Sequence, residues 1–181
     1  MDFIEIYDDA LPSENCDKLI EYLNNNPQAP GMVGDRMVDP IQKKSTELKD
    51  SLFSLHPLSF QLISSTLKEY TEKYIEKYTP LKNMKRWGVD DEFTIKKFEG
   101  EDEGFFAWHT EHGIVKPYRI LVWMFYLNDA QCGTEFFHHP NVESKKGRLV
   151  IWPAGWTHYH KGVTPNKGIK YIMSGWYSFQ Q

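Results

Sequence analysis

His109 and Glu111 are separated by one residue in the segment Phe-Ala-Trp-His-Thr-Glu, and six of the seven histidines lie between His109 and His160. The segment has the composition of a β-strand, and alternation along a strand would place the imidazole and the carboxylate on one face. A third ligand from a later strand, either His158 or His160, would complete a set of two histidines and one carboxylate. Such a set leaves coordination positions open on the metal and suits non-haem Fe(II) and oxygen chemistry.

The segments after this pair follow a definite order. Residues 119–129 read Arg-Ile-Leu-Val-Trp-Met-Phe-Tyr-Leu-Asn-Asp, residues 132–136 read Cys-Gly-Thr-Glu-Phe, and a Lys-Gly pair precedes the apolar run 149–153. His160 then begins His-Lys-Gly-Val, and Lys170 is the tenth residue after it. This order and spacing, from Phe93 to Trp176, resemble the Fe(II)/2-oxoglutarate-dependent oxygenases, and specifically their small prolyl-hydroxylase-like branch.

The resemblance implies that His109, Glu111 and His160 bind Fe(II). It favours His160 over His158 as the third ligand because His160 has the family's spacing to the basic residue at 170. Glu111 departs from the aspartate that most of the family carries, and its carboxylate is one methylene longer. Phage and bacterial relatives with a Trp-His-x-Glu motif resemble this chain more closely still.

Lys170 matches the family's basic residue, which implies that it binds the far carboxylate of the cosubstrate 2-oxoglutarate. The residues agree with this role, because a lysine alternating into the interior beside Ile169 and Ile172 is costly to bury unless it is paired with an anion. Tyr126 matches the family's tyrosine and is predicted to add a hydroxyl hydrogen bond to the same carboxylate. The implied cofactor set is Fe(II) and 2-oxoglutarate, with ascorbate as a reductant.

The resemblance implies hydroxylation of a prolyl residue in a peptide or protein, with release of succinate and CO2. Arg119 and Trp176 match family positions at the mouth of the site and are predicted to contact this substrate, and His158 is predicted to line the pocket. Two alternatives remain open. A cupin-like metalloenzyme that is not an oxygenase could also present two histidines and a carboxylate on a jelly roll, and a non-catalytic module could keep the fold to bind peptides.

Length and composition exclude other classes of protein. A chain of 181 residues with 40% hydrophobic and 25% charged residues is expected to form one soluble domain spanning 1–181. The net charge of −4 argues against nucleic acid as a partner. The longest apolar run, residues 120–127, is too short to cross a membrane. An acidic N-terminus and two distant cysteines favour a cytoplasmic protein without disulfides.

The pattern of apolar residues predicts the elements that must position these side chains. Helical periodicity predicts helices at about 13–26 and from Pro57 to about 78. Residues 27–40, which carry several prolines and glycines, are expected to form a loop or a short extended excursion, and a lid is the functional role considered for residues 27–44. Strands are predicted at the N-terminus and, roughly, at 93–98, 105–110, 119–128, 134–138, 148–152, 157–163 and 169–179.

Helices first and antiparallel strands afterwards indicate an α+β fold, in which helices cover one side of a β-sandwich or barrel. The family resemblance specifies this barrel as a double-stranded β-helix, also called a cupin-like jelly roll. It would consist of a helical brace in residues 1–85 and a jelly-roll core in residues 93–179.

Overall fold

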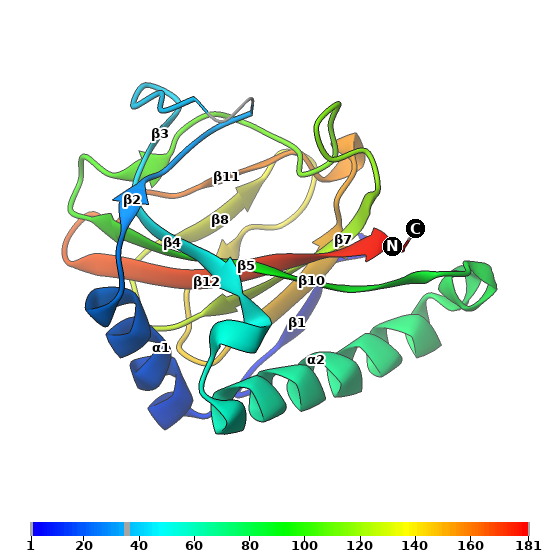
Figure 1. Ribbon diagram of the computed structural model, residues 1–181. Coiled ribbons are helices and arrows are strands. Elements are labelled where there is room, and N and C mark those ends of the chain that lie inside the picture. Colours follow the sequence, from blue (N-terminus) through cyan, green and yellow to red (C-terminus); the bar gives the residue numbers. More distant parts are fainter. Residues whose placement is uncertain (1, 35–36, 181) are drawn as a thin grey trace.

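The computed structural model describes residues 2–34 and 37–180. Its largest sheet contains the strands β1 (Glu5–Tyr7), β2 (Ala29–Pro30), β4 (Thr46–Ser51), β5 (Trp87–Glu99), β7 (Arg119–Tyr126), β10 (Leu149–Pro153) and β12 (Ile169–Phe179). Every pairing in this sheet is antiparallel, and the spatial order is β1-β10-β7-β12-β5-β4-β2 (Figure 1). The C-terminal strand β12 therefore lies near the centre, between β7 and β5.

A smaller sheet lies over one face of the large sheet. It contains β8 (Gly133–Phe136), β9 (Val142–Glu143) and β11 (His160–Gly162) in the order β11-β8-β9, and a separate pair joins β3 (Lys43–Lys44) to β6 (Gly104–Phe105). Phe136 and Val142 of the small sheet pack against Val122 and Trp152 of the large one. The two sheets thus enclose a common interior, which confirms the predicted double-stranded β-helix.

Strand β7 shows how one sequence serves both sides of the large sheet. Leu121, Trp123 and Phe125 belong to the core on the helix side, whereas Val122 and Met124 belong to the core between the two sheets. A strand buried on both faces needs apolar residues at consecutive positions, which explains the uninterrupted apolar run in this segment.

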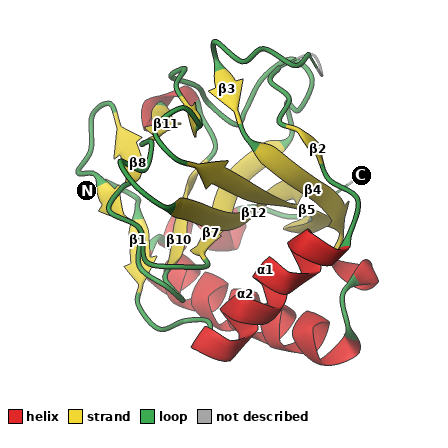
Figure 2. Ribbon diagram, turned by 90° about the vertical axis from the view of Figure 1, so that its left-hand side faces the viewer, coloured by secondary structure: helices red, strands yellow, loops and turns green. Residues whose placement is uncertain are grey.

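Two α-helices cover the outer face of the large sheet (Figure 2), as the helical periodicity predicts. Helix α1 (Ser13–Asn25) buries Cys16, Leu19 and Leu23, and helix α2 (Pro57–Lys77) buries Ile63, Thr66, Leu67 and Tyr74. Burying a leucine side chain of this kind contributes about 1.5–3 kcal/mol. No described helix combines the length and apolar character needed to cross a bilayer.

Helix α2 begins where proline allows it. Pro57 occupies the first turn, where its missing N–H costs no hydrogen bond. The ring of His56 accepts a hydrogen bond from the backbone N–H of Leu58 at 3.3 Å, which caps the helix. Two short 3₁₀ turns flank helix α2: η1 (Leu52–Ser54) precedes it and η2 (Thr79–Asn83) follows it. A third, η3 (Trp156–His158), precedes strand β11.

Several predicted strand boundaries were wrong. Of the expected strand 105–110, only Phe105 pairs as part of a strand (β6), because the chain beyond it leaves the sheet and returns through a bridge between His109 and His160. The expected strand 157–163 divides into the turn η3 and the short β11. Strand β4 was missed because Thr-Glu-Leu-Lys-Asp-Ser buries Leu48 alone, which leaves no apolar alternation to detect.

The segment 27–44, considered as a lid, is partly structured. Ala29–Pro30 pairs with β4, Lys43–Lys44 pairs with β6, and the backbone N–H of Gly31 donates to the carbonyl of Ser45 at 2.9 Å. Residues 35–36 of the segment lie outside the described part of the chain, and its proposed action as a lid stays a prediction.

Candidate metal centre

The bridge between His109 and His160 places the two imidazoles side by side. The backbone N–H of each residue donates to the carbonyl of the other, at 2.9 and 3.0 Å. Nδ1 of His109 lies 3.1 Å from the Ala107 carbonyl, and Nδ1 of His160 lies 2.9 Å from the His158 carbonyl. A carbonyl can only accept, so each Nδ1 carries the proton and each Nε2 is free to bind a metal.

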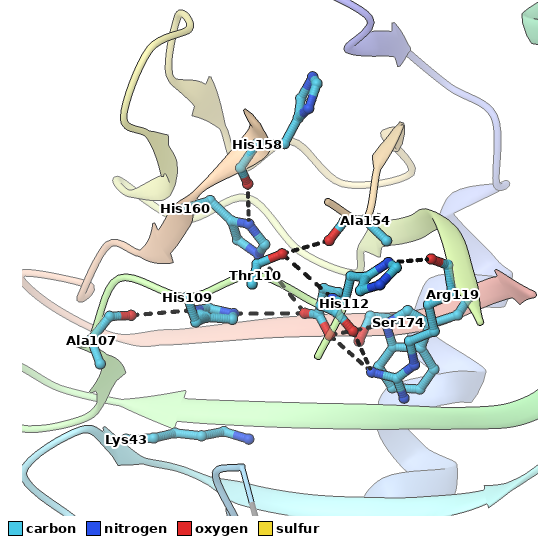
Figure 3. A network of polar contacts seen from close by, with 12 residues as sticks. Lys43, Ala107, His109, Thr110, His112, Arg119, Ala154, His158, His160 and Ser174 are labelled. Carbon is cyan, nitrogen blue, oxygen red and sulfur yellow. Dashed lines mark hydrogen bonds and ion pairs between the residues drawn. The ribbon is translucent and has the colours of Figure 1, made fainter. Parts of the chain in front are cut away.

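Glu111 completes the triad. Its Oε1 lies 3.6 Å from Nε2 of His109 and 3.8 Å from Nε2 of His160, and one ligand atom from each residue falls within 4.8 Å of the others. Both rings turn toward the same point in Figure 3. Two imidazole nitrogens and one carboxylate oxygen beside an open pocket are the donor set expected for Fe(II), so these residues fit that ion.

The second carboxylate oxygen of Glu111 accepts hydrogen bonds from residues outside the triad. Oε2 accepts hydrogen bonds from Nη1 of Arg119 at 3.2 Å and from the indole N–H of Trp176 at 3.0 Å. The guanidinium carbon of Arg119 lies 3.4 Å from the centre of the Trp176 ring, so the two donors also stack on each other. Both were expected at the mouth of the site, but they are buried and support the carboxylate.

The charges around the triad favour the forms that bind a metal. Burial opposes ionisation of Glu111, but the positive charge that surrounds the carboxylate, including that of Lys96, outweighs it, so its pKa lies well below the ordinary value. Burial, aided by the neighbouring His109, lowers the pKa of His160 to about 3. A deprotonated carboxylate and a neutral imidazole are both ready to donate electron pairs.

One pocket opens beside the triad. Its remaining walls are mostly apolar and include two lysines; they are formed by Lys96, Phe98, Phe105, Val122, Met124, Thr134, Trp152, Gly162, Lys170, Ile172 and Ser174. Phe105 stacks on the His109 ring with centroids 3.6 Å apart and planes 10° from parallel, which fixes the ring's orientation.

Lys170 reaches this pocket from β12 and is 2% exposed. Its ammonium donates to the carbonyls of Gly133 at 3.2 Å and Val163 at 2.5 Å. An ammonium has three donors, so one remains for a ligand in the pocket. Burial lowers the pKa of Lys170 to about 8, because the desolvation of the ammonium is not offset by a carboxylate of the protein.

The structure places Tyr126 and His158 outside the pocket lining. The buried hydroxyl of Tyr126 lies 2.7 Å from the Thr134 hydroxyl and 3.3 Å from the Val142 carbonyl, and Thr134 is the residue that reaches the pocket. The His158 ring turns away from His160 (Figure 3) and lies 2.7 Å from the carbonyl of Asp2. It belongs to a 3₁₀ turn, so it does not share a strand face with His160 as strand alternation predicts.

Lys96 and Phe105 are site residues that the motifs did not identify. A signal for Lys96 existed, because Phe93 and Ile95 of β5 face the helix-side core while Lys96 and Phe98 face the pocket. Strict alternation along this strand would have predicted that the Lys96 side chain points into the protein interior. Phe105 carries no such signal, because its contact with His109 depends on the turn that the chain makes between them.

Comparisons with known proteins agree with this geometry. The model of the 2OG-Fe(II) oxygenase superfamily matches residues 93–178. No curated protein sequence matches the chain. Among solved structures, the chain is similar to the collagen prolyl hydroxylase of Paramecium Bursaria Chlorella virus-1, with 16% identity, a TM-score of 0.71, and coverage of 98% of this chain and 96% of that one.

Two cellular prolyl hydroxylases have the same fold. The Pseudomonas putida prolyl-4-hydroxylase is 15% identical with a TM-score of 0.74, and the match covers 98% of this chain and 94% of that one. The Trichoplax adhaerens prolyl hydroxylase, solved with a peptide fragment of hypoxia inducible factor, is 12% identical with a TM-score of 0.75 and coverage of 98% and 84%. The match over the strand core that carries the triad supports a 2-oxoglutarate-dependent dioxygenase of the 2OG-Fe(II) oxygenase superfamily.

Proposed function

We propose that this dioxygenase uses O2 to hydroxylate a prolyl residue in a peptide or protein and to convert 2-oxoglutarate to succinate and CO2, with one oxygen atom of O2 entering the prolyl product and the other entering succinate. One observation carries the proposal: a single pocket is lined by the metal-binding triad and by the buried ammonium of Lys170. A metal centre alone would suit many reactions. A cation buried in the same pocket suits a cosubstrate that has a carboxylate at each end.

His109, Glu111 and His160 would hold Fe(II), which with bound 2-oxoglutarate and O2 would supply the oxidising chemistry. The protein's own part is to bind and orient. The remaining donor of Lys170 binds the far carboxylate, and a charge-assisted hydrogen bond of this kind is about twice as strong as a neutral one. The apolar walls keep water away from the reacting centre.

The prolyl part of the proposal is supported by the similar structures. The viral, bacterial and animal proteins named above are prolyl hydroxylases, and each match covers nearly all of this chain. One was solved with a peptide fragment, which supports a peptide or protein as the partner. Arg119 and Trp176 would act first on the Glu111 carboxylate and, through it, on the metal.

The test is 2-oxoglutarate turnover with a panel of proline-containing peptides, each matched to a peptide in which alanine replaces proline. We expect succinate release to rise with at least one proline peptide, ascorbate to sustain that turnover, and mass spectrometry to find one added oxygen on proline. The His160→Ala variant should release no succinate. Equal succinate release with every proline peptide and its alanine partner would contradict the prolyl assignment.

Two further measurements, the activity of Lys170→Ala and peptide binding without turnover, separate the alternative functions. A cupin-like enzyme that is not an oxygenase has no need for Lys170, so its activity would survive Lys170→Ala. A non-catalytic module would bind peptides without consuming 2-oxoglutarate.

A further inference from the structure

Lys96 is a buried cation whose role the metal triad and Lys170 do not explain. It lies toward the C-terminal end of β5, is 9% exposed and lines the same pocket as the triad. Its ammonium donates a hydrogen bond to the hydroxyl of Ser174 at 3.1 Å. Among the described residues, no carboxylate lies within 4.0 Å of this ammonium. Donors of the ammonium therefore remain for a ligand.

The other buried cations beside the triad contrast with it. Lys43 pairs with Glu47 at 2.6 Å, and Arg119 pairs with Glu111 at 3.2 Å. Burying an ammonium without an anionic partner is costly. Lys96 and Lys170 thus share one property, which is a buried positive charge facing the pocket without a carboxylate of the protein beside it.

The position of Lys96 lies between Lys170 and the metal ligands. In the pairing of β5 with β12, Lys96 stands opposite Ile172, whereas Lys170 stands opposite Phe98, one inward-facing position further along. The charge of Lys96 also lowers the pKa of Glu111 and that of Lys170, so its field reaches both ends of the pocket.

We propose that Lys96 binds a carboxylate inside the pocket, as a second cation beside Lys170. This inference rests on the proposed function and extends it to the chemistry of the ligands. Two carboxylates fit the position: the metal-proximal carboxylate of 2-oxoglutarate, or a free carboxylate of the substrate, as on an amino acid or a C-terminal residue. Both would form charge-assisted hydrogen bonds to the ammonium.

The test uses binding, so it does not depend on turnover. Lys96→Met removes the charge at similar length, Lys96→Arg keeps it, and Lys97→Met is the matched control on the same strand, because Lys97 pairs with the exposed Glu99. Each full-length protein is loaded with Mn(II) and titrated by calorimetry, first with 2-oxoglutarate. With 2-oxoglutarate present, each protein is then titrated with free L-proline and with a short prolyl peptide. Each of these ligands is used both with a free carboxylate and as the amide.

A loss of about tenfold or more in 2-oxoglutarate affinity in Lys96→Met, with affinity largely kept in Lys96→Arg, would assign Lys96 to the cosubstrate. Unchanged 2-oxoglutarate affinity with a lost preference for free prolyl carboxylates over amides would assign it to the substrate. The inference is overturned if Lys96→Met and Lys97→Met bind 2-oxoglutarate equally and Lys96→Met leaves the acid-over-amide ratio at the wild-type value.

Thermal unfolding separates ligand binding from a structural role. Replacing an unpaired buried charge by methionine should leave the unliganded protein as stable as before or more stable, whereas the stabilisation added by the ligand should shrink. A lower unfolding temperature without ligand, together with undiminished ligand stabilisation, would show that Lys96 serves the fold. Failure of the prolyl peptides in turnover would leave the 2-oxoglutarate titration readable, so the two proposals fail separately.

Discussion

The indole N–H of Trp176 donates to Oε2 of Glu111 at 3.0 Å, while Oε1 of the same carboxylate faces both histidines of the triad. The indole thereby fixes which oxygen is available to the metal. Trp176 belongs to the central strand β12, so the orientation of the carboxylate depends directly on the large sheet. The longer side chain of glutamate reaches from its loop to both the metal position and this strand.

Trp176→Phe should weaken metal binding while preserving the fold. The variant keeps the ring but removes the donor to Glu111, and losing such a supporting hydrogen bond costs about 10–100-fold in metal affinity. Competition with a chelator measures the affinity. Trp123→Phe is the control, because the indole N–H of Trp123 has no hydrogen-bond partner in the described structure and lies in the helix-side core. Equal affinities in the two variants would contradict the supporting role of Trp176.

The affinity for 2-oxoglutarate should fall at alkaline pH. Burial lowers the pKa of Lys170 to about 8, so the ammonium that binds the carboxylate is lost as pH rises through that value. We expect constant affinity up to about pH 7 and a fall approaching about tenfold per pH unit above pH 8. Lys170→Arg stays protonated in this range and should flatten the profile. An unchanged slope in that variant would assign the titration to another group.

The same shift predicts how stability without ligand depends on pH. The folded-state pKa of Lys170 lies below its ordinary value of 10.5, so between about pH 8 and pH 10.5 the unfolded chain holds a proton that the folded chain has released. The contribution of Lys170 to the free energy of unfolding therefore rises with pH across this window. Between these pH values the free energy of unfolding, measured by chemical denaturation, should rise more steeply with pH in the wild type than in Lys170→Met. An equal pH dependence in the two proteins would contradict the lowered pKa of Lys170.

Tyr126→Phe tests the predicted hydrogen bond from Tyr126 to the cosubstrate. Because the hydroxyl already contacts Thr134 and the Val142 carbonyl, we expect a loss of about 1 kcal/mol in the free energy of unfolding and little change in 2-oxoglutarate affinity. Thr134→Val, which changes a residue of the pocket wall, should weaken that affinity more. A larger loss of affinity in Tyr126→Phe than in Thr134→Val would support the direct contact.

Replacing His158 or His160 by alanine should have opposite effects on metal binding. His160→Ala removes a ligand of the triad and is expected to abolish stoichiometric Fe(II) binding. His158→Ala should keep the metal and lose about 1 kcal/mol of stability, because its ring bonds to the Asp2 carbonyl. Metal analysis after dialysis, with thermal unfolding of both variants, distinguishes the two roles. Loss of the metal in His158→Ala alone would reverse the assignment.

The triad could be predicted from the sequence because its members belong to motifs that are defined by short spacings along the chain. His109 and Glu111 are separated by one residue, and His160 has the spacing to Lys170 that the family resemblance associates with a metal ligand and a basic residue. The fold class followed from the order of helices and strands. These features need no knowledge of which strands become neighbours.

The remaining features depend on pairing between distant segments. Strand β4 has one buried apolar residue, Leu48, and forms because β5 offers it an edge. Strand β5 begins at Trp87 rather than near Phe93 because its first residues pair with the end of β12, although Asp90 and Asp91 interrupt any apolar pattern. The turned-away ring of His158 likewise follows from a turn that alternation along a strand does not anticipate.

The two-sided burial of β7 has a consequence for how the enzyme can change. Leu121, Trp123 and Phe125 hold the helices, whereas Val122 and Met124 shape the pocket wall. Substitutions at the second set alter the reaction chamber and the core between the sheets without touching the helix contacts, so the pocket wall and the helix contacts depend on separate, interleaved positions. A directed-evolution library confined to the pocket-facing positions would sample new substrates while the contacts between the large sheet and the helices stay intact.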